Sequence, residues 1–151
     1  MRASETPVAR CEALVVPGIE RAVGHVRHWL RDLVGADHPA FHDSAVCLSE
    51  LLTNALRHTD SGRGGQMRVR LAVAEGSLWA EVADDGCAAT VPHIRAASGE
   101  SGRGLRIVDA YADAWGVERR GPGHAVWFLS PLDLRRENQR VSRRRRSCCS
   151  G

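Results

Sequence analysis

The clearest apolar pattern lies between residues 41 and 58. Apolar side chains recur there at spacings of three to four residues, at Phe41, Ala45, Leu48, Leu52 and Leu56. This is the period of an α-helix that buries one face. We therefore predict a helix from about Phe41 to His58 whose apolar stripe packs in the core.

Two other segments have the same helical period. One runs from about Gly18 to Gly35, with polar residues on its outer side. The other begins at Gly102-Arg103-Gly104-Leu105 and continues to about Asp113. We predict an amphipathic helix for each.

Alternation of apolar and polar residues predicts five strands. They lie near residues 11–16, 69–73, 78–82, 115–119 and 125–129. Turns that contain glycine separate the second strand from the third and the fourth from the fifth, which indicates two β-hairpins. This order of elements favours an α+β two-layer sandwich, with helices on one face of a mixed, mostly antiparallel sheet. A wound parallel α/β fold fits poorly because the strands are not each followed by a helix.

The length of 151 residues fits one domain with one core. Seven of the 21 basic residues lie in residues 135–151 beside one acid, so that segment carries +6 and residues 1–134 carry −3. We expect a flexible N-terminus at 1–10, a folded domain at 11–134 and a disordered arginine-rich tail at 135–151. Weak contact of the tail with nucleic acid or an acidic partner is the alternative.

Composition excludes several classes. No apolar run approaches the roughly 18 residues of a membrane span, and the N-terminus has no signal-peptide centre, so we expect a soluble cytoplasmic protein without a membrane partner. The five cysteines form no CxxC pair, which argues against a disulfide framework or a zinc site. Lysine is absent. A P-loop and a eukaryotic-type protein kinase site are thereby excluded, since both place a lysine on the phosphates.

Glu50 and Asn54 are the first candidates for chemistry. They lie one turn apart on the same side of the predicted helix, roughly opposite its apolar stripe. The amide oxygen of Asn54, together with phosphate oxygens, suffices to hold Mg²⁺. Glu50 could then act on a water or an incoming hydroxyl as a general base. The alternative is an ordinary solvated helix face.

Two glycine-containing segments add to this pair. Asp84 follows a buried strand, where its carboxylate can accept a hydrogen bond from an exocyclic amine such as that of adenine, and Gly86 lets a ring approach the backbone. Gly102 and Gly104 come immediately before a helix, whose free N–H groups can receive a phosphate. Residues 87–101 between them are small and polar, as in loops that close over ligands. Taken singly, these segments could equally be a turn and a helix-entry loop.

The order of the three segments resembles the N, G1 and G2 boxes of the GHKL nucleotide-binding superfamily. The sequence segments SELLTNALRH, EVADDG and GRGLRIVDAYADAWG are most similar to those of the anti-sigma factor serine kinases, and the resemblance extends over about residues 12–130. The resemblance implies a Bergerat ATP-binding fold. By that resemblance Asn54 holds Mg²⁺ and Glu50 is the general base. The nucleotide-binding residues implied are Asn54, Asp84, Gly86, Gly102, Arg103, Gly104 and Leu105.

Members of this kinase family phosphorylate a serine on an antagonist protein and sequester a sigma factor. We therefore expect an ATP- and Mg²⁺-dependent serine protein kinase that regulates transcription by partner switching. The alternative is a nucleotide-binding interaction module of the same fold with little or no kinase activity. It is favoured by two departures from the family pattern, Ala88 in place of a glycine and Ala125 where a threonine is common. Similar proteins often form homodimers, so a homodimer is possible here, and we expect no direct, specific nucleic-acid partner.

Overall fold

The structure, a computed structural model, describes residues 8–74, 76–86 and 101–132. They form five strands, three α-helices and one short 3-10 helix. In chain order these are β1 (Val8–Pro17), α1 (Glu20–Val34), α2 (Phe41–His58), η1 (Asp60–Gly62), β2 (Gln66–Ala74), β3 (Ser77–Ala83), α3 (Ser101–Tyr111), β4 (Ala114–Arg120) and β5 (Gly123–Pro131).

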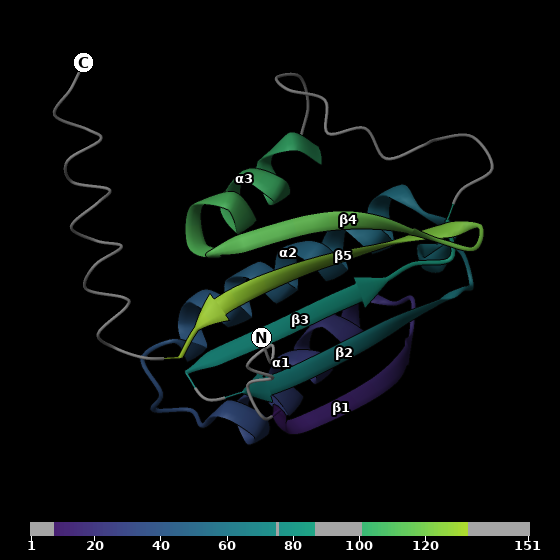
Figure 1. The fold of residues 1–151 in the computed structure, drawn as a ribbon. Helices are drawn as coiled ribbons and strands as arrows, with labels where there is room; N and C mark the ends of the chain where they lie inside the picture. The colour runs from purple at the N-terminus through teal and green to yellow at the C-terminus, as the bar shows by residue number, and fades with distance from the viewer. Residues whose placement is uncertain (1–7, 75, 87–100, 133–151) are drawn as a thin grey trace, which may run out of the picture.

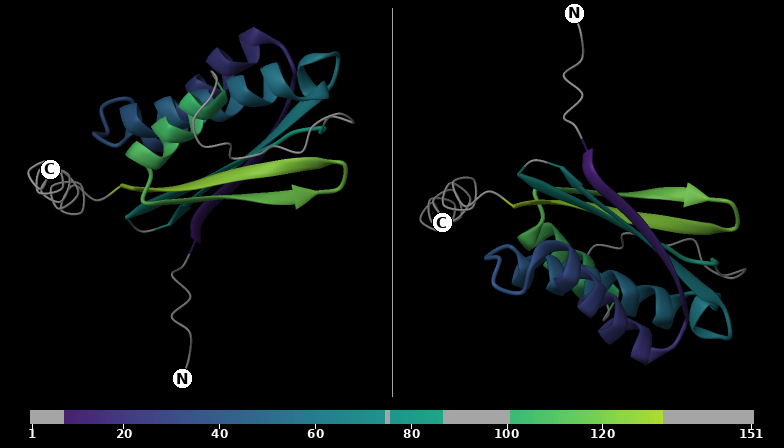
Figure 2. Two further views of the ribbon diagram at one scale, coloured as in Figure 1. Left: turned by 90° about the horizontal axis from the view of Figure 1, so that it is seen from above. Right: turned by 90° about the horizontal axis from the view of Figure 1, so that it is seen from below.

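The strands form one sheet in the order β1-β2-β3-β5-β4. All three helices lie on one face of it, with α1 and α2 side by side and α3 packed against α2 (Figure 1, Figure 2). The predicted α+β sandwich with helices on one face is therefore confirmed.

The sheet, expected to be mixed and mostly antiparallel, is antiparallel at every neighbouring pair of described strands. Two helices separate β1 from β2, and they return the chain to the end of the sheet where β1 stopped, so Pro17 pairs with Gln66. Strands β3 and β4 flank a single helix and run in the same direction. They do not pair with each other because β5 lies between them, antiparallel to both.

The core lies between the helices and the sheet. Every second residue of the inner strands faces the helices, and Val69, Leu71, Leu78, Ala80 and Phe128 are fully buried there. From α2 the predicted stripe contributes Ala45, Leu48 and Leu52, with Phe41 and Leu56 partly buried beside it. The buried arc of α2 is wider than the predicted stripe, because α1 and α3 cover its flanks; it also includes Ser44, Cys47, Leu51 and Ala55.

Strand β1 begins earlier than predicted. Residues 8–10, which we expect from the sequence in a flexible N-terminus, belong to this strand; Val8 and Arg10 pair with β2, with a shift of register between them. The pattern concealed them because β1 is an edge strand carrying Arg10 and Glu12, whose side chains form an ion pair of 2.7 Å. Residues 1–7, the predicted tail at 135–151, Glu75 and most of the predicted lid, including Ala88, lie outside the described residues. Among the helices that are described, none is long and apolar enough to cross a membrane.

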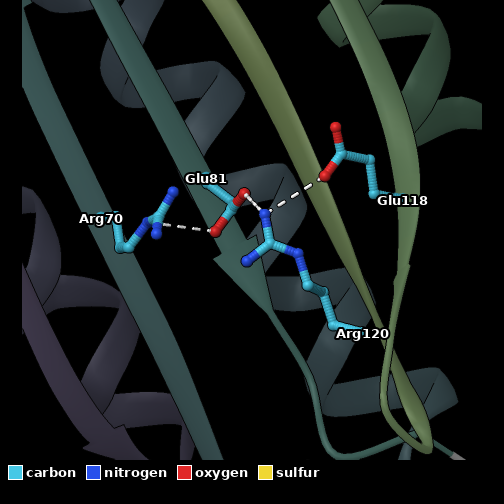
Figure 3. Close-up of polar contacts among 4 residues, drawn as sticks. All are labelled: Arg70, Glu81, Glu118 and Arg120. Carbon is cyan, nitrogen blue, oxygen red and sulfur yellow. Dashed lines mark hydrogen bonds and ion pairs between the residues drawn. The ribbon is translucent and has the colours of Figure 1, made fainter.

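The sheet face that is turned away from the helices carries a buried glutamate. The Glu81 side chain on β3 is only 3% exposed (Figure 3). Its Oε1 lies 3.3 Å from Arg70 Nε, and its Oε2 lies 3.0 Å from Arg120 Nη2. Arg120 also contacts Glu118 at 3.2 Å, and Arg70 lies over the ring of Trp79. A carboxylate is retained at such a buried position only when cations compensate its lost hydration.

Replacing Glu81 by alanine is expected to lower the free energy of unfolding by about 1–3 kcal/mol, the usual cost of losing a charged hydrogen bond. The loss is limited because Arg70 and Arg120 are about two-fifths exposed and water can partly rehydrate them. Urea unfolding measures it. Glu118→Ala is the control, since that exposed carboxylate should contribute less than about 1 kcal/mol. Equal losses in both variants would show that burial does not strengthen this cluster.

Candidate functional site

Glu50 and Asn54 project from α2 at the edge of its buried arc. With 3.6 residues per turn, Asn54 lies next to Leu51 and Cys47, both of which are buried. The pair lies opposite the predicted stripe, but the buried arc is wider than that stripe and extends to the side of Asn54. Both side chains are half-buried, and neither has a hydrogen-bond partner among the residues described. An amide and a carboxylate in that condition are available for an external ligand.

Asp84 follows directly after β3 and is held by β5. Its N–H donates to the carbonyl of His124 at 2.9 Å. Its oxygen Oδ1 accepts from the N–H of Gly86 at 2.7 Å and from that of His124 at 3.2 Å. Within the described chain, Oδ2 accepts no hydrogen bond and forms no ion pair. The carboxylate is thus fixed in orientation, with one oxygen left to accept a further hydrogen bond.

Gly86 brings this segment to the end of α2. Its φ of +76° is a conformation that favours glycine, and a Cβ there would collide with the carbonyl of Pro122. Its own carbonyl accepts from the N–H of Asp60 at 2.7 Å. Asp60 comes shortly after His58, the last residue of α2, so its bond to Gly86 places Asp84–Gly86 beyond that end of the helix. Asn54 lies about 6 Å before the same end along the helix axis.

The predicted phosphate-binding segment lies in α3. This helix begins at Ser101, so Gly102, Arg103 and Gly104 form its first turn and do not precede it as predicted. The N–H groups of a first turn have no intrahelical acceptor, so they remain candidates for an anion. Leu105 is partly buried against the core, which gives it a packing role in addition.

Sequence reasoning missed two residues of this region, His124 and Ser61. His124 acts through its backbone, which gives no residue-type signal. Ser61 is fully buried in the connection between α2 and β2 and bonds to Gln66 and Asp85. The serine and threonine among glycines after α2 were the available signal for a tightly bonded turn.

Ala125, at which the family commonly has a threonine, lies on β5. Alternation along β5 turns Val126 and Phe128 toward the helices and Ala125 toward the other face. Ala125 is fully buried but not part of the core between helices and sheet. The residue bonded to Asp84 is its neighbour His124. The side chain of Ala125 therefore faces away from the helices, one residue along β5 from the N–H that binds the Asp84 carboxylate.

An all-protein metal site is absent from the described residues, since no three histidine, cysteine, aspartate or glutamate side chains gather there. Asn54 fits the other type of Mg²⁺ site, in which one side-chain oxygen joins phosphate oxygens and waters. Its unpartnered, half-buried amide is the observation that supports this fit.

Comparison with known proteins places the chain among nucleotide-binding domains. Residues 17–129 match the sequence model of the histidine kinase-like ATPase domain. An uncharacterized protein of Streptomyces coelicolor is 37% identical over 82 residues, which are 52% of this chain and 76% of the relative.

Two solved structures are similar in fold. The crystal structure of the RsbU and RsbW domains of Rv1364c from Mycobacterium tuberculosis matches with a TM-score of 0.61 and 22% identity. The match covers 81% of this chain and 32% of that one, so this chain spans about a third of it. The histidine kinase domain of a blue-light activated histidine kinase from Erythrobacter litoralis matches with a TM-score of 0.49 and 23% identity, over 80% of this chain and 62% of that one.

Proposed function

This chain belongs to the family of histidine kinase-like ATPase domains, and from that premise we propose that it is an ATP- and Mg²⁺-dependent serine protein kinase of the anti-sigma factor type. Its substrate is a serine of an antagonist protein. Its second partner is a sigma factor, whose sequestration and release control transcription.

The pair of Glu50 and Asn54 is the observation that carries the proposal. A carboxylate and an amide lie there one turn apart, half-buried and without a hydrogen-bond partner in the described chain, so both are free to bind an external ligand. A binding module needs only the amide. The carboxylate has a use when a hydroxyl proton must be removed.

Asp84 supports adenine as the base. Its Oδ1 is occupied by two N–H groups, so the free Oδ2 offers an acceptor in a fixed direction. The exocyclic amine of adenine is a donor and satisfies it, whereas the carbonyl of guanine at the same ring position does not.

The chain's residues then have separate roles. Asp84 orients the adenine ring, and the first-turn N–H groups of α3 receive phosphate oxygens. Asn54 would hold Mg²⁺, which neutralises charge on the phosphates. Glu50 accepts the proton of the serine hydroxyl as that oxygen bonds to the γ-phosphorus and the bond to ADP breaks.

Calorimetry with ATP, with and without Mg²⁺, is the first test. Incubation with labelled ATP and candidate antagonist proteins is the second, and we expect label on a serine of the cognate antagonist. ATP binding without any transfer would select the interaction-module alternative. Absence of ATP binding would overturn both.

Asn54→Ala is expected to weaken ATP binding in the presence of Mg²⁺ by about tenfold, the equivalent of one hydrogen bond to a charged group, and to leave binding in EDTA unchanged. The reason is that only the metal-dependent contact is removed. Ser49→Ala on the same helix is the control, because its hydroxyl bonds only to the carbonyl of Ala45 within the described chain. An equal loss with and without Mg²⁺ would contradict the metal role.

A further inference from the structure

Ser61 is the centre of a hydrogen-bond network between the end of α2 and the end of β3. Its hydroxyl donates to the carbonyl of Gln66 at 2.7 Å and accepts from the N–H of Asp85 at 2.9 Å. The Asp85 carboxylate returns to the same strand, where Oδ2 accepts from the N–H of Gln66 at 2.7 Å. We call these three residues the Ser61–Asp85 network.

Burial indicates that this network has a single arrangement. Ser61 is fully buried, so the carbonyl of Gln66 and the N–H of Asp85 would lose their partners if its hydroxyl were absent. Gly65 allows the close approach, since a Cβ there would collide with Asp85 Oδ2. Gln66 and Asp85 are exposed, but the hydroxyl that joins them is buried and fully bonded, which favours one conformation of the network.

The network also restrains the two residues next to Asp85 in the chain, Asp84 and Gly86. Asp85 is held by both its N–H and its carboxylate, which leaves the preceding peptide unit little freedom. Gly86 is held by the N–H of Asp60, and the Asp84 carboxylate by Gly86 and His124. The direction in which Asp84 Oδ2 points is therefore set in part by side chains that do not contact the base.

We propose that Ser61 and Asp85 are positioning residues for nucleotide recognition, which hold Asp84 so that its free oxygen meets the adenine amine. The inference rests on the proposed function. Neither residue contacts the nucleotide; they decide how well the site distinguishes adenine from guanine.

Asp85→Ala is expected to weaken ATP binding by about three- to tenfold, the equivalent of one ordinary hydrogen bond, because the Asp85 carboxylate is exposed to water. Preference for ATP over GTP, measured by calorimetry with each nucleotide, is expected to fall by a similar factor. A loss of folded protein would lower both affinities equally and leave that ratio unchanged. Asp85→Asn should restore affinity and ratio, because its amide oxygen still accepts from Gln66.

Asp60→Ala is the matched control. It removes an acidic side chain from the same connection, and that side chain has no hydrogen bond in the described structure, so any general effect of lost charge appears there. Ser61→Ala gives a second variant, with the same expected fall in the ratio. As an independent readout, the amides of residues 84–86 should exchange hydrogen faster in Asp85→Ala than in the wild type.

The outcomes separate the two proposals. Wild-type protein that binds no ATP overturns the proposed function and this inference with it. Wild-type protein that binds ATP, together with an unchanged ATP-to-GTP ratio in Asp85→Ala and Ser61→Ala, overturns only the positioning role. A failure of Asp85→Asn to restore the ratio does the same.

Discussion

Glu50→Gln is expected to reduce serine phosphotransfer by about 10²–10⁴-fold, the usual contribution of a general base. Glutamine has nearly the same shape, and the Glu50 side chain makes no hydrogen bond within the described chain that would be lost. Only the ability to accept a proton is removed. Transfer of labelled phosphate to the antagonist measures the effect, and calorimetry should show ATP bound as in the wild type.

Glu20→Gln is the control for this substitution. Glu20 is exposed in the first turn of α1, where loss of its charge changes only the helix terminus. Transfer at the wild-type rate in Glu50→Gln would reject Glu50 as the base. A parallel loss of ATP binding would instead indicate that Glu50 holds the nucleotide.

Asp84→Asn is expected to weaken ATP binding by roughly ten- to a hundredfold, since a hydrogen bond to a charged group contributes about 1.5–3 kcal/mol. The amide oxygen of asparagine can still accept from Gly86 and His124, so the segment keeps its conformation. The amide nitrogen then replaces Oδ2. A donor there opposes the amine of adenine and suits the carbonyl of guanine.

The opposite effects expected on ATP and GTP affinity provide an internal control for Asp84→Asn. ATP affinity should fall while GTP affinity rises or stays constant, and thermal unfolding without nucleotide should stay near that of the wild type. Asp109→Asn is the control, a carboxylate of α3 that bonds only to Trp115 Nε1 in the described chain. Wild-type ATP affinity in Asp84→Asn would contradict adenine recognition by this residue.

Local sequence predicted most of the elements but not their assembly. Helix α2 has the predicted bounds because its apolar period is uninterrupted and its ends carry suitable charges, Asp43 at the start and Arg57 and His58 at the end. The sheet order was not predicted, since the place of β5 between β3 and β4 depends on contacts distant in sequence. The pattern of apolar and polar residues within one segment does not specify which distant segment it will pair with.

The candidate site divides in the same way. Glu50, Asn54 and Asp84 are predicted as site residues from their residue types and their order in the chain. Their half-buried state came only from the structure, because α3 covers the flank of α2 through long-range packing. His124 was missed since it contributes a backbone N–H, which every residue but proline possesses.

The sheet order leaves β1 and β4 with one unpaired side each. Such a side offers free N–H and C=O groups on which a strand of another chain could assemble into aggregates. Along β4 the exposed run Glu118, Arg119 and Arg120 places charges at this margin, and β1 ends in Pro17, which has no N–H to donate. These residues on the two edge strands should therefore limit aggregation of the domain at high concentration.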